Sequence, residues 1–245
     1  MKLFNHKFIS IDKLSTFIKK LDKNKTIFIQ VLCGDLSTPK IQSILGVLTA
    51  ELPLAKITGA STAGEICNGV VSRKGILISF SLFENVKVET HYFPITNYKS
   101  GVEAAGKIIQ PDTKACILFS EAIKGDPESF LGGFSSINKK VVLAGGNAGD
   151  NSEFTKTFII KGSHIFYEGI VIASLSSDSL IVSNHYTLEW TPIGKEMCIT
   201  KVDKNIIYEI DHKPVFDIFK YYLGDDALKN IPQNTVEFPL IKINE

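Results

Sequence analysis

Two short segments rich in small residues each end in Ala-Gly followed by a carboxylate. The first runs Lys56-Ile-Thr-Gly-Ala-Ser-Thr-Ala-Gly-Glu65, and the second runs Val141-Val-Leu-Ala-Gly-Gly-Asn-Ala-Gly-Asp150. Exposed backbone N–H groups in glycine-rich turns form sites suited to a carboxylate, and an acidic side chain nearby can bind an ammonium group. The pattern therefore suits an amino-acid zwitterion. The candidate binding residues are Ser61, Thr62, Gly64, Glu65, Gly146, Asn147, Gly149 and Asp150.

The same small residues allow a second interpretation, in which no ligand is involved. Glycine permits positive φ angles and close approach of a neighbouring backbone. In that case the turns serve only to let two similar halves of the protein pack tightly. Both interpretations remain open from the sequence.

The two segments belong to a longer internal similarity, which should be sought first because it decides the architecture. Gly64 and Gly149 lie 85 residues apart, whereas Gly75 and Gly169, like His91 and His185, lie 94 apart. We predict two copies of one unit, at residues 10–95 and 100–187. The change of offset predicts about nine extra residues in the second copy, near 154–162.

The elements expected to position these turns follow from apolar periodicity and turn signals. Each copy is predicted to run α-β-α-β-β-β. The last strands of the copies are expected to be hairpins, at 75–82 with 86–93 and at 170–175 with 180–186. An extra strand pair is expected at 156–161 and 164–167. The predicted fold is mixed α/β (α+β): two mixed sheets that bury one face against each other and carry helices outside.

Composition excludes several classes of protein. The formal net charge is +1, so no strong electrostatic footprint for nucleic acid or an anionic membrane is expected. No apolar run approaches the roughly 20 residues of a membrane helix. The four cysteines lack CxxC spacing and suggest reduced core thiols in a cytoplasmic protein.

Four motifs in order carry a family resemblance: 57–66 (ITGASTAGEI), 144–150 (AGGNAGD), 190–194 (WTPIG) and 206–211 (IIYEID). With these motifs the chain resembles the FIST family, named for F-box and intracellular signal-transduction proteins. The resemblance covers the chain from about Thr26 onward. It implies a duplicated FIST N-type sensory domain at 1–189 and the beginning of the FIST C-type region at 190–245. In the family this second region runs well beyond the equivalent of Glu245.

The resemblance implies a cytoplasmic, non-enzymatic sensory module that binds a small ligand, with amino acids the usual proposal. Its expected partner is a signalling output protein or domain: a chemotaxis receptor, a histidine kinase or a cyclic-dinucleotide enzyme. No metal or cofactor is expected. Trp190, which follows the second copy, is a further candidate for the wall of the pocket, although packing at a junction explains it equally well.

Three alternatives stay open. Haem-linked nitric-oxide sensing, attributed to some FIST proteins, would need an axial ligand, for which His185 is a weak candidate. A small-molecule hydrolase or transferase would need a nucleophile and a base, and the sequence has no GxSxG, HExxH or P-loop motif. A scaffold domain without ligand is the third.

Overall fold

The structure is a computed structural model. It describes residues 1–121, 123–151, 153–185, 191–203, 206–231, 235, 237–241 and 243. The chain divides into two compact units, Met1–Asn184 and His185–Glu245. Tyr186 and the candidate Trp190 lie outside the described residues. Within the described part of the chain, no helix has the length and apolar character needed to cross a membrane.

In the first unit, one sheet has the strand order β1-β6-β2-β3-β10-β11. Its strands are β1 (Lys2–Lys7), β2 (Thr26–Cys33), β3 (Lys56–Ser61), β6 (Ile76–Phe83), β10 (Ile159–Lys161) and β11 (His164–Phe166). β2 and β3 are parallel, and the other neighbours are antiparallel. The sheet is mixed, as predicted. β4 (Glu65–Cys67) and β5 (Val70–Ser72) form a separate hairpin between β3 and β6.

The second sheet of this unit has the order β7-β12-β8-β9. Its strands are β7 (Lys87–Phe93), β8 (Thr113–Ser120), β9 (Val142–Asn147) and β12 (Ile170–Ser176). β8 and β9 are parallel, whereas β12 is antiparallel to both β7 and β8. Strand order and direction thus match the β1-β6-β2-β3 part of the first sheet. Such a match is what an internal duplication requires; the duplication itself stays a prediction.

The shared register corrects the predicted boundaries of the copies. β7 is the edge strand beside β12 as β1 is the edge strand beside β6, so β7 matches β1 and not the end of the first predicted copy. His91 lies opposite Ile172, and His6 lies opposite Ile78 at the corresponding position. The predicted pairing of His91 with His185 is therefore wrong. His185 is exposed, and none of the described residues 180–185 lies in a strand.

Both predicted hairpins at the ends of the copies are also wrong. β6 and β7 follow one another in the chain but belong to different sheets, because β7 pairs with β12. The predicted strand after β12 is absent from the described residues 180–185. The extra strand pair is present as β10 and β11, but β10 joins β3 of the first sheet. Strand partners are chosen by burial across the whole unit, which local turn signals do not report.

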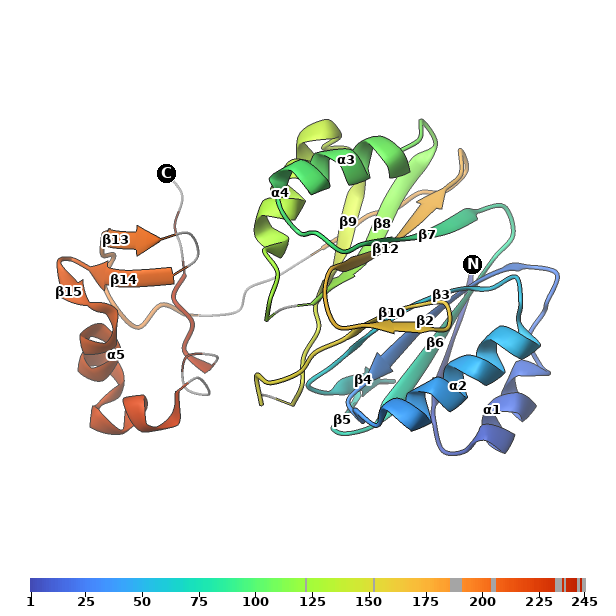
Figure 1. Cartoon of the computed structure of the whole chain (residues 1–245), viewed down its shortest axis with the longest axis horizontal. Coiled ribbons are helices and arrows are strands. Elements are labelled where there is room, and N and C mark those ends of the chain that lie inside the picture. Colours follow the sequence, from blue (N-terminus) through green and yellow to red (C-terminus); the bar gives the residue numbers. More distant parts are fainter. Residues whose placement is uncertain are drawn as a thin grey trace. The chain divides into compact units, whose positions relative to one another are not determined.

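Helices cover the outer face of each sheet, as predicted (Figure 1). The helices are α1 (Ile11–Ile18), α2 (Thr38–Glu51), α3 (Tyr98–Ile108) and α4 (Pro127–Ile137). α1 is capped by the Ser10 side chain and α4 by Asp126, each accepting a backbone N–H of the first turn. α1 and α2 bury their apolar faces with β2 and β6, and α3 and α4 pack against β8 and β12.

The inner faces of the sheets bury each other. Phe28 of β2 packs with Val88 of β7 and with Ala173 and Leu175 of β12. A further cluster joins Ala60 of β3 to Val171 of β12. The layers are therefore helix, sheet, sheet, helix, and the carboxyl ends of both parallel strand pairs lie within one compact unit.

The second unit contains a small antiparallel sheet and a helix. Its elements are β13 (Ile199–Asp203), β14 (Ile206–Ile210), β15 (Lys213–Pro214), α5 (Val215–Leu223) and a 3₁₀ turn, η1 (Asp225–Asn230). The predicted hairpin of β13 and β14 is confirmed. Gly224 follows α5 with a φ of 84°, a positive angle that glycine adopts easily.

Candidate functional site

A pocket of about 420 Å³ opens between the sheets of the first unit. It is lined from the carboxyl-terminal halves of the parallel pairs β2–β3 and β8–β9, which is where open α/β sheets usually bind ligands. The polar side chains that line it are Gln30, Ser61, Thr62 and Asn147. The rest of the wall comes from Leu32, Ala60, Ile117, Phe119, Ala144, Gly145 and Gly146.

The two small-residue turns meet at this pocket. The Gly149 N–H donates to the Ser61 carbonyl at 2.8 Å. Ser61 is also tied to the segment that precedes β10, since its N–H donates to the Phe158 carbonyl and its hydroxyl accepts the Phe158 N–H at 3.0 Å. The predicted proximity of the turns is confirmed.

Close backbone packing explains one glycine in each turn. A Cβ on Gly59 would overlap the carbonyl of Val31, and a Cβ on Gly145 would overlap the carbonyl of Leu118. These pairs face each other across β2–β3 and β8–β9 respectively. This close approach lies within each sheet, so it is not the packing between two halves that the second interpretation requires. Gly146 is different, because a Cβ there would meet no atom within 4 Å, and this residue borders the pocket.

Glu65 lies behind the pocket wall. Only 3% of its surface is exposed. One carboxylate oxygen accepts the Thr62 hydroxyl at 2.9 Å, and the other accepts the Ser72 hydroxyl at 3.2 Å. The carboxylate rests against Gly34, where a Cβ would collide with it, and against Gly75, where a Cβ would lie 3.1 Å from it. Glu65 therefore reaches the pocket through the Thr62 hydroxyl, not through its own oxygens.

Asp150 shapes its own loop, and the expected contact between its carboxylate and a ligand ammonium needs correction. Its exposed fraction is 4%, and its oxygens accept the N–H groups of Phe154, Thr155 and Lys156 at 2.6–3.0 Å. Burial raises the pKa of Asp150, but these backbone hydrogen bonds outweigh burial and leave the pKa below its ordinary value. Asp150 does not line the pocket, and neither do Gly64 and Gly149.

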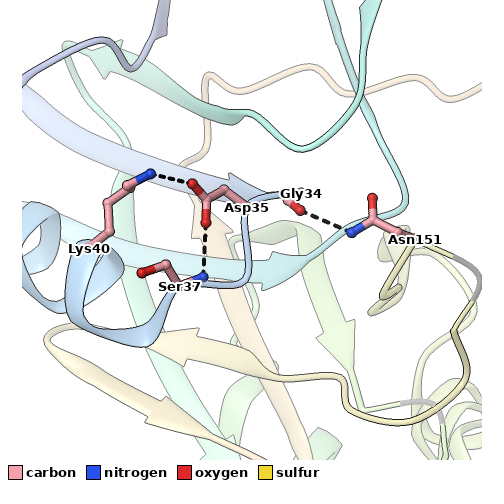
Figure 2. Close-up of polar contacts among 5 residues, drawn as sticks. All are labelled: Gly34, Asp35, Ser37, Lys40 and Asn151. Atoms are coloured by element: carbon pink, nitrogen blue, oxygen red, sulfur yellow. Dashed lines mark hydrogen bonds and ion pairs between the residues drawn. The ribbon is translucent and has the colours of Figure 1, made fainter.

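The following residue links this loop to the other half of the unit. The Asn151 side-chain N–H donates to the Gly34 carbonyl at 3.1 Å (Figure 2). Gly34 begins the loop from β2 to α2, in which Asp35 accepts the Ser37 N–H at 2.9 Å and pairs with Lys40 (Figure 2). The hydrogen bond from Lys40 is the main cause of the lowered pKa of Asp35. The loop after β2 and the loop after β9 are thus tied to each other across the two halves.

Sequence reasoning missed Glu121 and Gln30. Glu121 directly follows β8, is buried, and accepts the N–H groups of Ile123 and Lys124 and the Thr157 hydroxyl at 2.7–2.8 Å. Gln30 lines the pocket from the middle of β2. A polar side chain inside the apolar run TIFIQVLC was the available signal for Gln30.

Two histidines and two cysteines do not line the pocket. His6 and His91 each bury an Nε2 atom that has no hydrogen-bond partner among the described residues, and burial lowers the pKa of both. Cys33 and Cys116 are buried thiols on β2 and β8; burial raises the pKa of Cys116 to about 12, so it is held as the neutral thiol.

A comparison with known protein families identifies the domain that contains this pocket. The family model named FIST N domain matches residues 27–213. The chain belongs to this family. FIST domains are sensory domains associated with signalling, so the resemblance predicted from the motifs is confirmed. The matched range of the FIST N domain contains every pocket-lining residue and extends past Asn184, where the first compact unit ends. No curated protein matches the chain.

Proposed function

We propose that this FIST N domain is a non-catalytic sensory module whose pocket binds a small ligand, an amino acid, and passes the binding event to a signalling partner. The observation that supports this most is the shared pocket itself. Its wall comes from both small-residue turns, so a bound ligand touches both halves of the unit. Ligand pockets combine an apolar wall with a few placed polar groups, and this pocket has that character.

The hydrogen-bond directions around the pocket suit an amino acid. The Thr62 hydroxyl donates to Glu65, so its free lone pair can accept a hydrogen bond from an ammonium group. The Ser61 hydroxyl accepts the Phe158 N–H, which leaves its own proton to donate. Asn147 accepts the Ser120 hydroxyl at 2.7 Å, which leaves its side-chain N–H groups to donate to a carboxylate.

A binding role is supported over catalysis by the kinds of side chain at the pocket. Among the described lining residues none is His, Cys, Lys, Asp or Glu. A serine nucleophile needs an adjacent base that can take its proton, whereas the partner of the Ser61 hydroxyl among the described residues is the backbone N–H of Phe158, which is a donor and not a base. For the haem alternative, exposure of His185 gives no support for an apolar haem pocket.

The proposed partner is a signalling output protein or domain in the cytoplasm, such as a chemotaxis receptor, a histidine kinase or a cyclic-dinucleotide enzyme. Binding would favour the conformations in which both turns contact the ligand. A ligand shifts an equilibrium only by its differential affinity for the two states. The signal would therefore be a change in how well ordered the two turns are relative to each other.

The test is a thermal-shift screen of the full chain against the common amino acids, followed by calorimetry on those that bind. At a hundredfold excess over Kd, a bound amino acid should add about 2.7 kcal/mol of stability. Thr62→Val should weaken binding by roughly tenfold or more, because a hydrogen bond to a charged group contributes about 1.5–3 kcal/mol.

The matched control is Thr16→Val, on the exposed face of α1. This variant should bind the amino acid like the wild type. If no amino acid stabilises the wild-type chain or gives a heat of binding, the proposed function is wrong. Equal affinity of the wild type and Thr62→Val would show that Thr62 does not bind the ligand ammonium.

A further inference from the structure

Gln30 stands out among the residues that line the pocket. It is a polar residue in the middle of β2, where Ile29 and Val31 are buried in the helix-covered core. Side chains alternate along a strand, so Gln30 shares its face with Phe28, which lies in the inter-sheet core. Its carboxamide has no hydrogen-bond partner in the described part of the chain, although it lines the pocket.

Thr58, the neighbour of Gln30 across the sheet, is a second polar residue on this face. The register places Thr58 of β3 directly opposite Gln30, on the same face. Thr58 is fully buried, and its hydroxyl finds no partner among the described residues. Leaving a buried polar group unpaired costs about 1–3 kcal/mol. Thr58 does not line the pocket, whereas Gln30 does, so of these two neighbours the Gln30 carboxamide is the one placed to pair with a ligand.

The chemistry of Gln30 restricts which ligand group can do so. A carboxamide offers both N–H donors and a C=O acceptor. The nearby wall is apolar, with Leu32, Ile117 and Phe119, and no charged side chain occurs among the described lining residues. A ligand side chain that ends in a carboxylate brings acceptors only and leaves the Gln30 C=O without a donor, and an aliphatic group pairs with neither polar atom of Gln30.

We propose that Gln30 selects amino acids whose side chain ends in a carboxamide, so that glutamine and asparagine are the preferred ligand class. This rests on the proposed function and adds specificity to the same pocket. The ligand carboxamide pairs with the Gln30 carboxamide through two hydrogen bonds, while the zwitterion occupies the Ser61, Thr62 and Asn147 end. Sites that hydrogen-bond a ligand group reject analogues that lack it much more strongly than apolar pockets reject size differences.

Calorimetry on the full chain with glutamine, asparagine, glutamate and methionine tests the proposal. Glutamate and methionine have nearly the shape of glutamine, so differences among the three report the carboxamide. The wild type should bind glutamine or asparagine at least about tenfold more tightly than glutamate or methionine. Gln30→Met should lose that preference, with weaker glutamine binding and tighter methionine binding.

Ser79→Ala is the matched control, because Ser79 lies opposite Gln30 on β6 but does not line the pocket. It should keep the wild-type preference. If the wild type binds an amino acid but does not distinguish glutamine and asparagine from glutamate and methionine, this inference is overturned and the proposed function stands. If no amino acid binds, the proposed function fails first. The wild-type comparison decides the question even if Gln30→Met does not fold.

Discussion

At the scale of single residues, Asp150 contributes to stability through backbone hydrogen bonds. Its folded-state pKa lies below the unfolded value of about 3.9. A carboxyl group of this kind stabilises the fold above its unfolded pKa, and the contribution is lost as pH falls through the lower folded-state pKa. The stabilisation by Asp150 is therefore complete at neutral pH and disappears only in acid.

Asp150→Asn should lower the free energy of unfolding at pH 7 by about 1–3 kcal/mol, because the amide cannot accept the same N–H groups with both of its polar atoms. Its stability should also fall less steeply than that of the wild type below about pH 4. Urea unfolding at several pH values measures both effects. Asp178→Asn, at an exposed position, should behave like the wild type. Identical unfolding curves for Asp150→Asn and Asp178→Asn would contradict the structural role.

At the scale of elements, α3 and α4 approach each other through glycines. A Cβ on Gly101 of α3 would overlap the Phe130 carbonyl of α4, and a Cβ on Gly133 of α4 would overlap the Tyr98 carbonyl of α3. A Cβ on Gly106, also on α3, would meet no atom within 4 Å. Helix α3 thus carries one glycine that packing requires, Gly101, and one that packing does not require, Gly106.

Gly101→Ala should destabilise the protein by roughly 1–3 kcal/mol, the usual cost of overpacking, because the helix backbones must move apart. Gly106→Ala should stabilise it by about 0.5–1 kcal/mol through its higher helix propensity. Chemical denaturation of both variants gives the comparison. The described packing of α3 against α4 would be refuted if both alanines stabilised the protein equally.

At the scale of the whole first unit, the inner faces of the sheets form a common core. Phe28 is fully buried in it, with residues of β7 and β12 around the ring. Phe28→Ala should cost about 3–5 kcal/mol. Since the cavity opens between the sheets, amide hydrogen exchange should accelerate in β2 and in β12 alike.

The exposed ring of Phe154 provides the control, and Phe154→Ala should change stability little. Faster exchange in β2 alone, with β12 unaffected, would show that the sheets unfold independently. This outcome would also weaken the proposed signalling role, in which one ligand acts on both halves.

Much of this architecture could be predicted from local sequence. The strands β2, β3, β8 and β9 and the helices between them follow from apolar periodicity and caps, because those signals arise within a few residues. These strands and helices predict the helix-covered sheets and the proximity of the two small-residue turns. Ser61, Thr62, Gly146 and Asn147 are predictable pocket residues because small polar residues at strand ends are visible in the sequence alone.

Only the tertiary structure decided how strands from distant segments pair and which polar groups face the pocket. β7 lies in a different sheet from β6, and β10 pairs with β3, because strand pairing depends on burial over the whole unit. Glu65 and Asp150 end identical Ala-Gly-acid motifs, yet both are buried against their own loops. Gln30 faces the pocket because the second sheet lies over it. Local sequence determines the elements, whereas the environment of each side chain depends on contacts from residues far away in the chain.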